Sequence, residues 1–321
     1  MKRVIGMGLT RSSVAAASFS SSLCTTAHRP ALRVGATTAF AAGAAAAAAA
    51  AAATAAAVVS SDSTIKCDAY RANKYNEWHY ATVMVTGSNR GLGLEFVRQL
   101  TENGATVIAT CRSPDRAAEL KALGVQVEQL DTSDPASVEA MVARLKAQGV
   151  TIDVLINNAG VASKNHPVDP IVAADTEDIM RVFHTNVVGT VQTTNAVLAA
   201  GLMEKSEAPR IINLSSDLGS IHKTFTAQSA KVKPGGVCSY RISKAASNMA
   251  SRVFAAELGE KGYTVIALSP GWVQTDMGSS GGRAPPLTPQ TSIGGMLTVI
   301  ASLNKSDTGK FFLYDGSNLP W

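Results

Sequence analysis

From residue 81 onward, short runs of β-branched and apolar residues alternate with amphipathic stretches of helical period. Seven such runs lie at residues 82–85, 106–109, 125–129, 154–156, 210–214, 264–268 and 310–313. The helical stretches between them lie at residues 92–103, 114–123, 135–148, 176–203, 240–261 and 289–303. Apolar strands connected by helices form parallel sheets that are covered on both faces. The alternation therefore predicts a single doubly wound α/β domain with a seven-stranded parallel sheet.

The residues before this domain have a different composition. Residues 1–61 contain no acidic residue, and serine and alanine make up most of them. Their basic residues are Lys2, Arg3, Arg11, Arg29 and Arg33. Such a composition is typical of an organelle transit peptide. The sequence therefore predicts a leader at residues 1–60 that is removed in a mitochondrion or plastid, a linker at residues 61–80, and a catalytic domain at residues 81–321. A cytoplasmic location is the alternative.

Charge and composition argue against several other functions. The chain has 29 basic and 24 acidic residues, and the leader's basic residues account for the whole surplus of +5. The domain therefore has no basic excess for binding nucleic acid. The 4 cysteines form no CxxC pair, so we expect neither a metal site nor disulfides. Residues 44–53 are all alanine, which leaves a weak membrane anchor, a bipartite signal or an inert extension as alternatives to a leader.

A glycine-rich turn joins the first strand to the first helix. It reads TGSNRGLG over residues 86–93. Glycines permit a tight turn, close approach of a ligand to the backbone and close helix–strand packing, and the helix N-terminus presents amides to phosphates. This position predicts a Rossmann-type dinucleotide site rather than an ordinary turn. The expected cofactor-binding residues are Gly87, Ser88, Asn89, Arg90, Gly91, Leu92 and Gly93.

The end of the second strand indicates which dinucleotide binds. An NAD-preferring site normally offers an acidic residue there to the ribose hydroxyls, but this chain has Arg112. Arg112 and Arg90 could converge on a 2′-phosphate through charge-assisted hydrogen bonds. The sequence therefore favours NADP(H), with NAD(H) still possible. In the alternative interpretation, both arginines are solvated surface residues.

Tyr240 and Lys244 lie four residues apart in the sequence YRISK. On a helix, residues with this spacing share one face, so the lysine ammonium could lower the pKa of the phenol. A phenol primed in this way could exchange a proton near neutral pH, as the interconversion of a carbonyl and an alcohol requires. Taken alone, the pair could equally be an exposed helix face.

Four separated motifs give the chain a resemblance to a known family. TGSNRGLG, NNAG at residues 157–160, the serine pair at residues 215–216 and YRISK resemble the short-chain dehydrogenases/reductases over residues 81–321. NLSSDLGSI, YRISKAASN, SPGWVQTDM and FFLYDGSNLPW resemble the branch with C-factor-like and sniffer-like carbonyl reductases.

The resemblance implies a catalytic tetrad of Asn186, Ser216, Tyr240 and Lys244. Ser216 would hydrogen-bond the substrate oxygen, and Tyr240 would give the proton in reduction or take it in oxidation. Lys244 would hold the nicotinamide ribose and lower the pKa of Tyr240. Asn186 would position a water molecule that links Lys244 to solvent. The alternatives are that Ser215 replaces Ser216, and that Asn186 only makes a hydrogen bond at a helix bend.

The resemblance also implies further cofactor contacts. Asp131 would lie beside the adenine, residues 158–160 along the cofactor wall, and residues 270–271 with Thr275 near the nicotinamide carboxamide. The side chains concerned are Asp131, Asn158, Ala159, Gly160, Pro270, Gly271 and Thr275. Asn157 and Asn158 could instead simply close the end of a strand.

Two segments depart from a minimal domain. Ser216 and Tyr240 are 24 residues apart, which is more than the family commonly has, and residues 221–238 fill the difference. This insertion is either a cover over the substrate pocket or a disordered surface loop. A Gly/Ser/Pro-rich stretch at residues 278–289 is typical of a mobile lid that contributes few bulky pocket walls.

The sequence thus predicts an NADP(H)-dependent oxidoreductase that acts on a small carbonyl or secondary alcohol by direct hydride transfer without a metal. Reduction is the favoured direction. The alternative is a signalling or scaffold protein that binds the cofactor and turns over only incidentally. The family resemblance further implies a homo-oligomer, a dimer or tetramer, with long helices between subunits.

Overall fold

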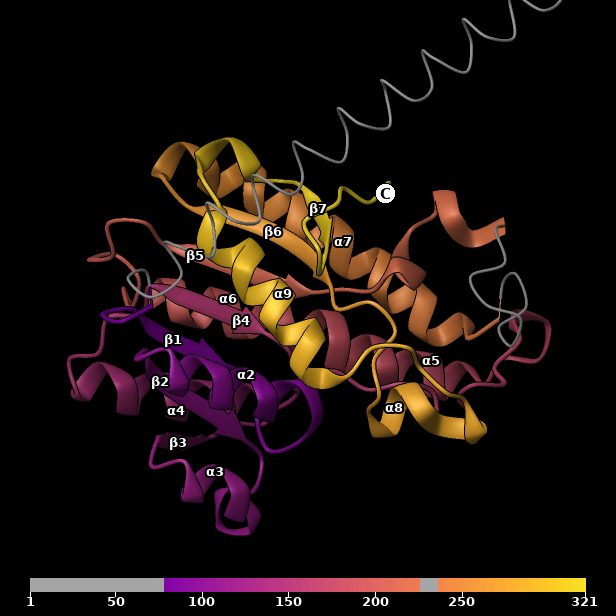
Figure 1. The fold of residues 1–321 in the computed structure, drawn as a ribbon, viewed down its shortest axis with the longest axis horizontal. Coiled ribbons are helices and arrows are strands. Elements are labelled where there is room, and N and C mark those ends of the chain that lie inside the picture. Colours follow the sequence, from indigo (N-terminus) through magenta and orange to yellow (C-terminus); the bar gives the residue numbers. More distant parts are fainter. Residues whose placement is uncertain (1–77, 226–235) are drawn as a thin grey trace, which may run out of the picture. The chain divides into compact units, whose positions relative to one another are not determined.

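Seven strands form one sheet in the computed structural model, which describes residues 78–225 and 236–321 (Figure 1). The strands are β1 (Thr82–Val85), β2 (Thr106–Cys111), β3 (Gln126–Gln129), β4 (Val154–Asn157), β5 (Arg210–Leu214), β6 (Thr264–Ser269) and β7 (Phe311–Leu313). Every neighbouring pair is parallel, in the order β3-β2-β1-β4-β5-β6-β7. The predicted parallel sheet is confirmed. The predicted leader and nearly all of the predicted linker lie outside the described residues.

Helices connect the strands. The α-helices are α2 (Gly91–Glu102), α3 (Ala118–Ala122), α4 (Pro135–Ala147), α5 (Thr176–Phe183), α6 (Gly189–Ala199), α7 (Cys238–Leu258), α8 (Asp276–Ser279) and α9 (Pro289–Ser302). The short 3-10 turns are η1 (Pro114–Arg116), η2 (Ile171–Ala173), η4 (Asp217–Gly219), η5 (His222–Phe225), η6 (Gly259–Lys261), η7 (Ser280–Gly282) and η8 (Lys305–Asp307). The helix predicted at residues 176–203 is interrupted by a π-helical turn, η3 (His184–Val188). α7 begins two residues before the predicted start of that helix, and α8 was not predicted.

Local sequence signals explain where several helices begin. Asp134 precedes α4 and accepts a hydrogen bond from the Ala136 amide, with proline at the first helical position. Asp175 caps α5, and Thr288 caps α9 by accepting from the Thr291 amide. Such caps satisfy amides that have no partner inside the helix. The caps fix where these helices start relative to the strand ends.

The sheet separates two apolar cores. Val83 and Val85 of β1 pack on one face with α2 and α9, whereas Met84 packs on the other face with α4, α6 and α7 (Figure 1). Successive side chains of a strand point to opposite faces, so an uninterrupted apolar strand fills both cores. All three side chains are fully buried. This burial is the reason why the strands lack alternation between polar and apolar residues.

The order of the strands defines one edge of the sheet as the place for a ligand. β1 and β4 are neighbours, but the chain leaves β1 toward β2 and leaves β4 toward β5. The chain segments that follow β1 and β4 therefore run in opposite directions along the sheet and leave a crevice between them. Ligands of open α/β sheets bind in this crevice, outside the carboxyl ends of the strands. The glycine turn follows β1, and the predicted catalytic serine follows β5.

Candidate active site

The glycine turn has the backbone geometry of a phosphate cradle. Gly87 and Gly91 have φ angles of 67° and 56°, in the left-handed region that favours glycine. The residue before α2, Arg90, gives the helix no side-chain cap. The amides of the first turn of α2 therefore receive no hydrogen bond from the Arg90 side chain, and an anion such as a diphosphate could accept hydrogen bonds from them. The turn fits the predicted cofactor.

The asparagines after β4 shape this turn. The Asn158 side chain donates hydrogen bonds to the carbonyl oxygens of Thr86 (2.8 Å) and Gly87 (3.0 Å). Asn157 is buried and donates to Thr194 and Asn213 instead. Both side chains thus satisfy local groups, in agreement with the simpler interpretation of these residues. Residues 158–160 still lie against the turn, because a β-carbon on Gly87 would be 2.9 Å from the Cα atom of Ala159.

The two arginines expected at the 2′-phosphate have different surroundings. The Arg90 guanidinium forms an ion pair with Asp276 of α8 at 2.9 Å, and both side chains are largely exposed. The Arg112 side chain is also exposed, at the end of β2. No described contact joins the two guanidinium groups. An exposed ion pair is worth little, so Arg90 could exchange Asp276 for a phosphate at small cost. Beyond β3, the carboxylate of Asp131 accepts a hydrogen bond from the Ser133 amide.

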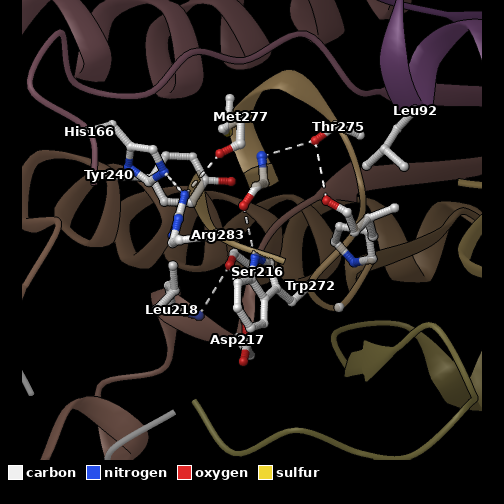
Figure 2. Close-up of a pocket in the computed structure, with 14 residues that line it drawn as sticks. Leu92, His166, Ser216, Asp217, Leu218, Tyr240, Trp272, Thr275, Met277 and Arg283 are labelled. Atoms are coloured by element: carbon white, nitrogen blue, oxygen red, sulfur yellow. Dashed lines mark hydrogen bonds between the residues drawn. The ribbon is translucent and has the colours of Figure 1, made fainter. Parts of the chain in front are cut away.

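A cavity brings together residues from both halves of the sheet (Figure 2). The predicted site residues that line it are Leu92, Ser216, Tyr240, Pro270, Gly271 and Thr275. Its other walls are His166, Asp217, Leu218, Trp272, Val273, Met277, Gly278 and Arg283. The cavity also meets the glycine turn, because a β-carbon on Gly91 would lie 3.8 Å from Thr275. The structure therefore places a hydroxyl and a phenol beside the cofactor cradle.

Tyr240 and Lys244 are neighbours, as their spacing on α7 predicts. The Lys244 Nζ lies 5.6 Å from the centroid of the phenol ring and donates a 2.6 Å hydrogen bond to the Leu214 carbonyl. Burial lowers the pKa of Lys244 to about 8. The pKa of Tyr240 is raised, mainly by burial and further by the negative charge of Asp217, while a hydrogen bond with Ser216 acts in the opposite direction. The predicted lowering of the Tyr240 pKa is therefore wrong for this structure, because desolvation by burial is the largest influence on the phenol.

The serine pair after β5 divides into two environments. Ser215 is buried and donates a hydrogen bond to the Asn248 side chain. Ser216 lines the cavity, and its Oγ accepts a hydrogen bond from the Leu218 amide at 3.2 Å. The position of the two hydroxyls favours Ser216 over Ser215 as the group that meets a substrate.

Asn186 lies in the π-helical turn and is 2% exposed. Its amide nitrogen donates to the Val161 carbonyl and to the Ser243 hydroxyl, each at 2.9 Å. Its side-chain oxygen accepts from the Val161 amide at 2.8 Å. These bonds match the alternative of a hydrogen-bonding role at a helix bend, since they tie the segment after β4 to α7. π-turns of this kind are frequent at functional sites.

Sequence reasoning missed His166, Trp272, Met277 and Arg283 as cavity walls. Arg283 belongs to the stretch at residues 278–289 that was expected to supply few bulky walls, and it is the one bulky side chain that this stretch adds to the cavity. The stretch begins with the end of α8 and the turn η7, and Arg283 then reaches the cavity wall (Figure 2). Its side chain is nearly buried, with 9% exposed. One sequence signal could have revealed Arg283 as a cavity wall: it is a large charged residue in a Gly/Pro-rich segment that follows β6, at the edge of the sheet where ligands bind.

The insertion at residues 221–238 is described only at its ends. Ile221 and Phe225 are 74% and 90% exposed, and neither lines the cavity. At the other end, Asp169 accepts hydrogen bonds from the Cys238 and Ser239 amides and thereby fixes the start of α7. Residues 226–235, which would have to form a cover, lie outside the described residues.

The described residues contain neither a metal-ligand cluster nor a membrane-spanning helix. Within residues 78–225 and 236–321, no group of three or more His, Cys, Asp or Glu side chains is placed to hold a metal ion. In the same part of the chain, no helix has both the length and the apolarity to span a bilayer. The alanine-rich stretch lies outside these residues.

The cradle at the sheet edge and the adjoining cavity define an oxidoreductase of the dinucleotide-binding α/β class. The family model described as short chain dehydrogenase matches residues 81–284. The C-signal protein of Myxococcus xanthus is 37% identical over 170 residues, which cover 53% of this chain and 93% of that protein. The chain belongs to the short-chain dehydrogenase/reductase family.

Two solved structures share this fold. A carbonyl reductase from chicken fatty liver with bound NADPH has a TM-score of 0.67 and 36% identity, over 76% of this chain and 100% of that one. The carbonyl reductase Sniffer of Drosophila melanogaster has a TM-score of 0.66 and 30% identity, with the same coverage. The predicted resemblance to carbonyl reductases is therefore confirmed.

Proposed function

We propose that this protein is an NADP(H)-dependent carbonyl reductase that acts on a small carbonyl compound or the corresponding secondary alcohol. One observation carries the proposal: Ser216 and Tyr240 line one cavity, which adjoins the glycine turn, and the Lys244 Nζ lies 5.6 Å from the phenol ring. The similarity to a carbonyl reductase with bound NADPH supports the choice of cofactor and substrate class.

The cofactor would extend from the glycine turn to the cavity. The amides at the start of α2 would hold the diphosphate, Arg90 and Arg112 the 2′-phosphate, and Asp131 the adenine. Thr275 and the turn after β6 would hold the nicotinamide end beside the cavity. When bound, NADPH supplies the hydride, and the side chains of this protein supply orientation and the proton.

Tyr240 would be the proton donor. A phenol is protonated at neutral pH, so its hydroxyl can give a proton to the oxygen of a carbonyl that accepts a hydride. Burial raises the pKa of Tyr240, which keeps the group protonated but by itself makes it a weaker acid. Ser216 would orient and polarise that oxygen. Lys244, whose pKa of about 8 lies near neutrality, could then return a proton to the phenolate. In this scheme, Lys244 acts as a proton reservoir and not as the group that primes the phenol.

Replacement of the phenol tests the function. In the full-length protein, Tyr240→Phe should lower kcat/KM for carbonyl reduction by about 100-fold to 10,000-fold, because general acid catalysis contributes that much. NADPH binding, measured by fluorescence titration, should survive, since the ring remains. Ser215→Ala is the matched control for Ser216→Ala, because only the second hydroxyl lines the cavity. An active Tyr240→Phe variant would remove the basis of the proposal.

The same assays separate an enzyme from a scaffold. A protein that binds NADPH tightly but oxidises it with no member of a broad panel of aldehydes and ketones would fit the signalling alternative. The Ser216–Tyr240 pair in the cavity favours chemistry, because a purely binding role needs the glycine turn but no proton donor.

A further inference from the structure

Arg283 is a nearly buried cation in the wall of the candidate substrate cavity. Its Nε donates a hydrogen bond to the Ser280 carbonyl, and its Nη2 donates to the Met277 carbonyl at 2.9 Å. The guanidinium carbon lies 6.0 Å from the centre of the Trp272 ring. The residue is 9% exposed, so the side chain is fixed in place and has lost most of its hydration. None of the described hydrogen bonds engages Nη1.

The carboxylates around the cavity do not neutralise this charge. Asp276 is paired with Arg90. The Asp169 carboxylate accepts hydrogen bonds from the Ser239 amide and the Cys238 thiol, and its charge also acts on His166. Asp217, which lines the cavity, interacts electrostatically with Tyr240 and Arg241. Among the described residues, no carboxylate forms an ion pair with Arg283. A buried charge without a counterion is unfavourable, so this position is suited to an anion that a ligand supplies.

His166 does not provide a counter-charge. Its Nε2 lies 2.6 Å from the Nη2 of Arg283. Because a guanidinium can only donate, Nε2 must accept, and the imidazole is neutral with its proton on Nδ1. The pKa of His166 is lowered, because burial and the charge of Arg283 outweigh the Met277 backbone hydrogen bond and the Asp169 charge, and this direction agrees with a neutral imidazole. The imidazole therefore orients the guanidinium without neutralising it.

The cation is close to the proposed chemistry. The His166 ring lies 6.4 Å, centroid to centroid, from the ring of Tyr240, and Arg283 contacts the same imidazole (Figure 2). The guanidinium and the phenol therefore both lie beside the His166 ring. An anionic group held by Arg283 would lie a few bonds from a carbonyl held by Ser216 and Tyr240.

We propose that Arg283 binds a carboxylate of the substrate, so that the preferred substrates are short keto acids and the corresponding hydroxy acids. This inference rests on the proposed reductase function and narrows its substrate class. The carbonyl carbon of the keto acid receives the hydride of NADPH, and its oxygen receives the proton of Tyr240, which leaves NADP⁺ and a hydroxy acid. Trp272 and Met277 provide the apolar walls for the carbon chain between the two polar groups.

Pairs of acids and esters test this proposal. The kcat/KM values of the full-length protein are measured with NADPH for levulinate against methyl levulinate, and for acetoacetate against methyl acetoacetate. The wild-type protein should prefer the acid of each pair. Arg283→Met keeps an unbranched apolar stem but removes the charge, and should lower the acid-to-ester ratio by about tenfold or more. A general loss of activity lowers kcat/KM for the acid and for the ester equally, so it leaves the acid-to-ester ratio unchanged.

Two further variants sharpen the result. Arg283→Lys keeps the charge and should retain part of the preference for the acid. Arg252→Met is the matched control, because Arg252 is exposed, lies against Trp321 and does not line the cavity. Its acid-to-ester ratio should equal that of the wild type. An unchanged ratio in Arg283→Met overturns the proposal, as does a wild-type protein that prefers the esters. The wild-type comparison decides the matter even if Arg283→Met does not fold.

The failure of the proposed function would be visible separately. If the wild-type protein reduces neither acids nor esters, calorimetry of levulinate binding in the presence of NADP⁺ tests whether Arg283 forms a carboxylate-binding site. Binding to the wild type that is lost in Arg283→Met supports a carboxylate site without reductase activity. No binding to the wild type overturns the site as well.

Discussion

Gly93 offers the sharpest structural test of the cofactor cradle. A β-carbon at this position of α2 would lie 2.2 Å from the Gly87 carbonyl oxygen, 2.6 Å from the Asn158 amide nitrogen and 2.9 Å from the Ser88 Cα. Two of these three atoms belong to the backbone and cannot rotate away. In a helix, alanine is otherwise favoured over glycine by up to about 1 kcal/mol. Overpacking at a closely packed position costs about 1–3 kcal/mol. We therefore expect Gly93→Ala to destabilise the protein by about 2 kcal/mol net.

Gly294 of α9 provides the matched control. It is also a helical glycine, but its β-carbon would meet only the Gln99 side chain at an ordinary 3.5 Å. Gly294→Ala should leave Tm unchanged or raise it, whereas Gly93→Ala should lower Tm by about 4–8 °C for a domain of this size. Scanning calorimetry or fluorescence melts measure the difference.

The same variants report on the cofactor. Relief of the overlap in Gly93→Ala must move the turn, so the rise in Tm that NADPH gives the wild type should shrink, as mass action requires for a weaker ligand. In Gly294→Ala, the rise should be preserved. If Gly93→Ala melts like Gly294→Ala and gains as much from NADPH, the turn does not pack as the structure shows and the reasoning is refuted.

Three other expectations follow from the structure. Arg112→Asp should lower the preference for NADPH over NADH by about tenfold or more, because charge-assisted hydrogen bonds to the 2′-phosphate are lost; an unchanged ratio in steady-state kinetics would contradict the role of Arg112. Burial lowers the Lys244 pKa to about 8. Below pH 8 the folded protein therefore holds a buried charge, which lowers its free energy of unfolding. As the pH rises from about 8 toward the ordinary lysine pKa, the folded state loses this proton before the unfolded state does, and the free energy of unfolding increases. Lys244→Met should thus be more stable than the wild type at pH 7 by up to about 3 kcal/mol, and denaturant titrations should show this gap closing toward pH 10; a constant gap would argue against the shift. Met180 of α5 and Met249 of α7 are 64% and 66% exposed, and the two helices adjoin, so we expect them to form a subunit interface. Met249→Glu should then lower the molar mass that light scattering measures. A wild-type protein that is already monomeric would contradict this expectation.

Pattern alone was enough for the order and type of the main elements. The apolar runs predicted all seven strands within two residues of their boundaries, because burial on both faces leaves a local signal in each run. The glycine turn was recognisable for a similar reason, since a left-handed backbone favours glycine and the close contacts of Gly87 and Gly93 leave no room for a β-carbon. The π-turn within the predicted helix 176–203 had no comparable signal, because it depends on bonds between Asn186 and residues of two other segments.

The surroundings of the chemical groups were decided by tertiary structure. The spacing of Tyr240 and Lys244 correctly placed the two groups side by side, but the pKa of the phenol depends on burial, which no spacing reveals. Arg283 and His166 are 117 residues apart in the chain and meet only because the loops after β4 and β6 converge on one edge of the sheet. Helical and strand periods are local properties of the chain. Desolvation and contacts between distant loops exist only once the whole sheet has assembled.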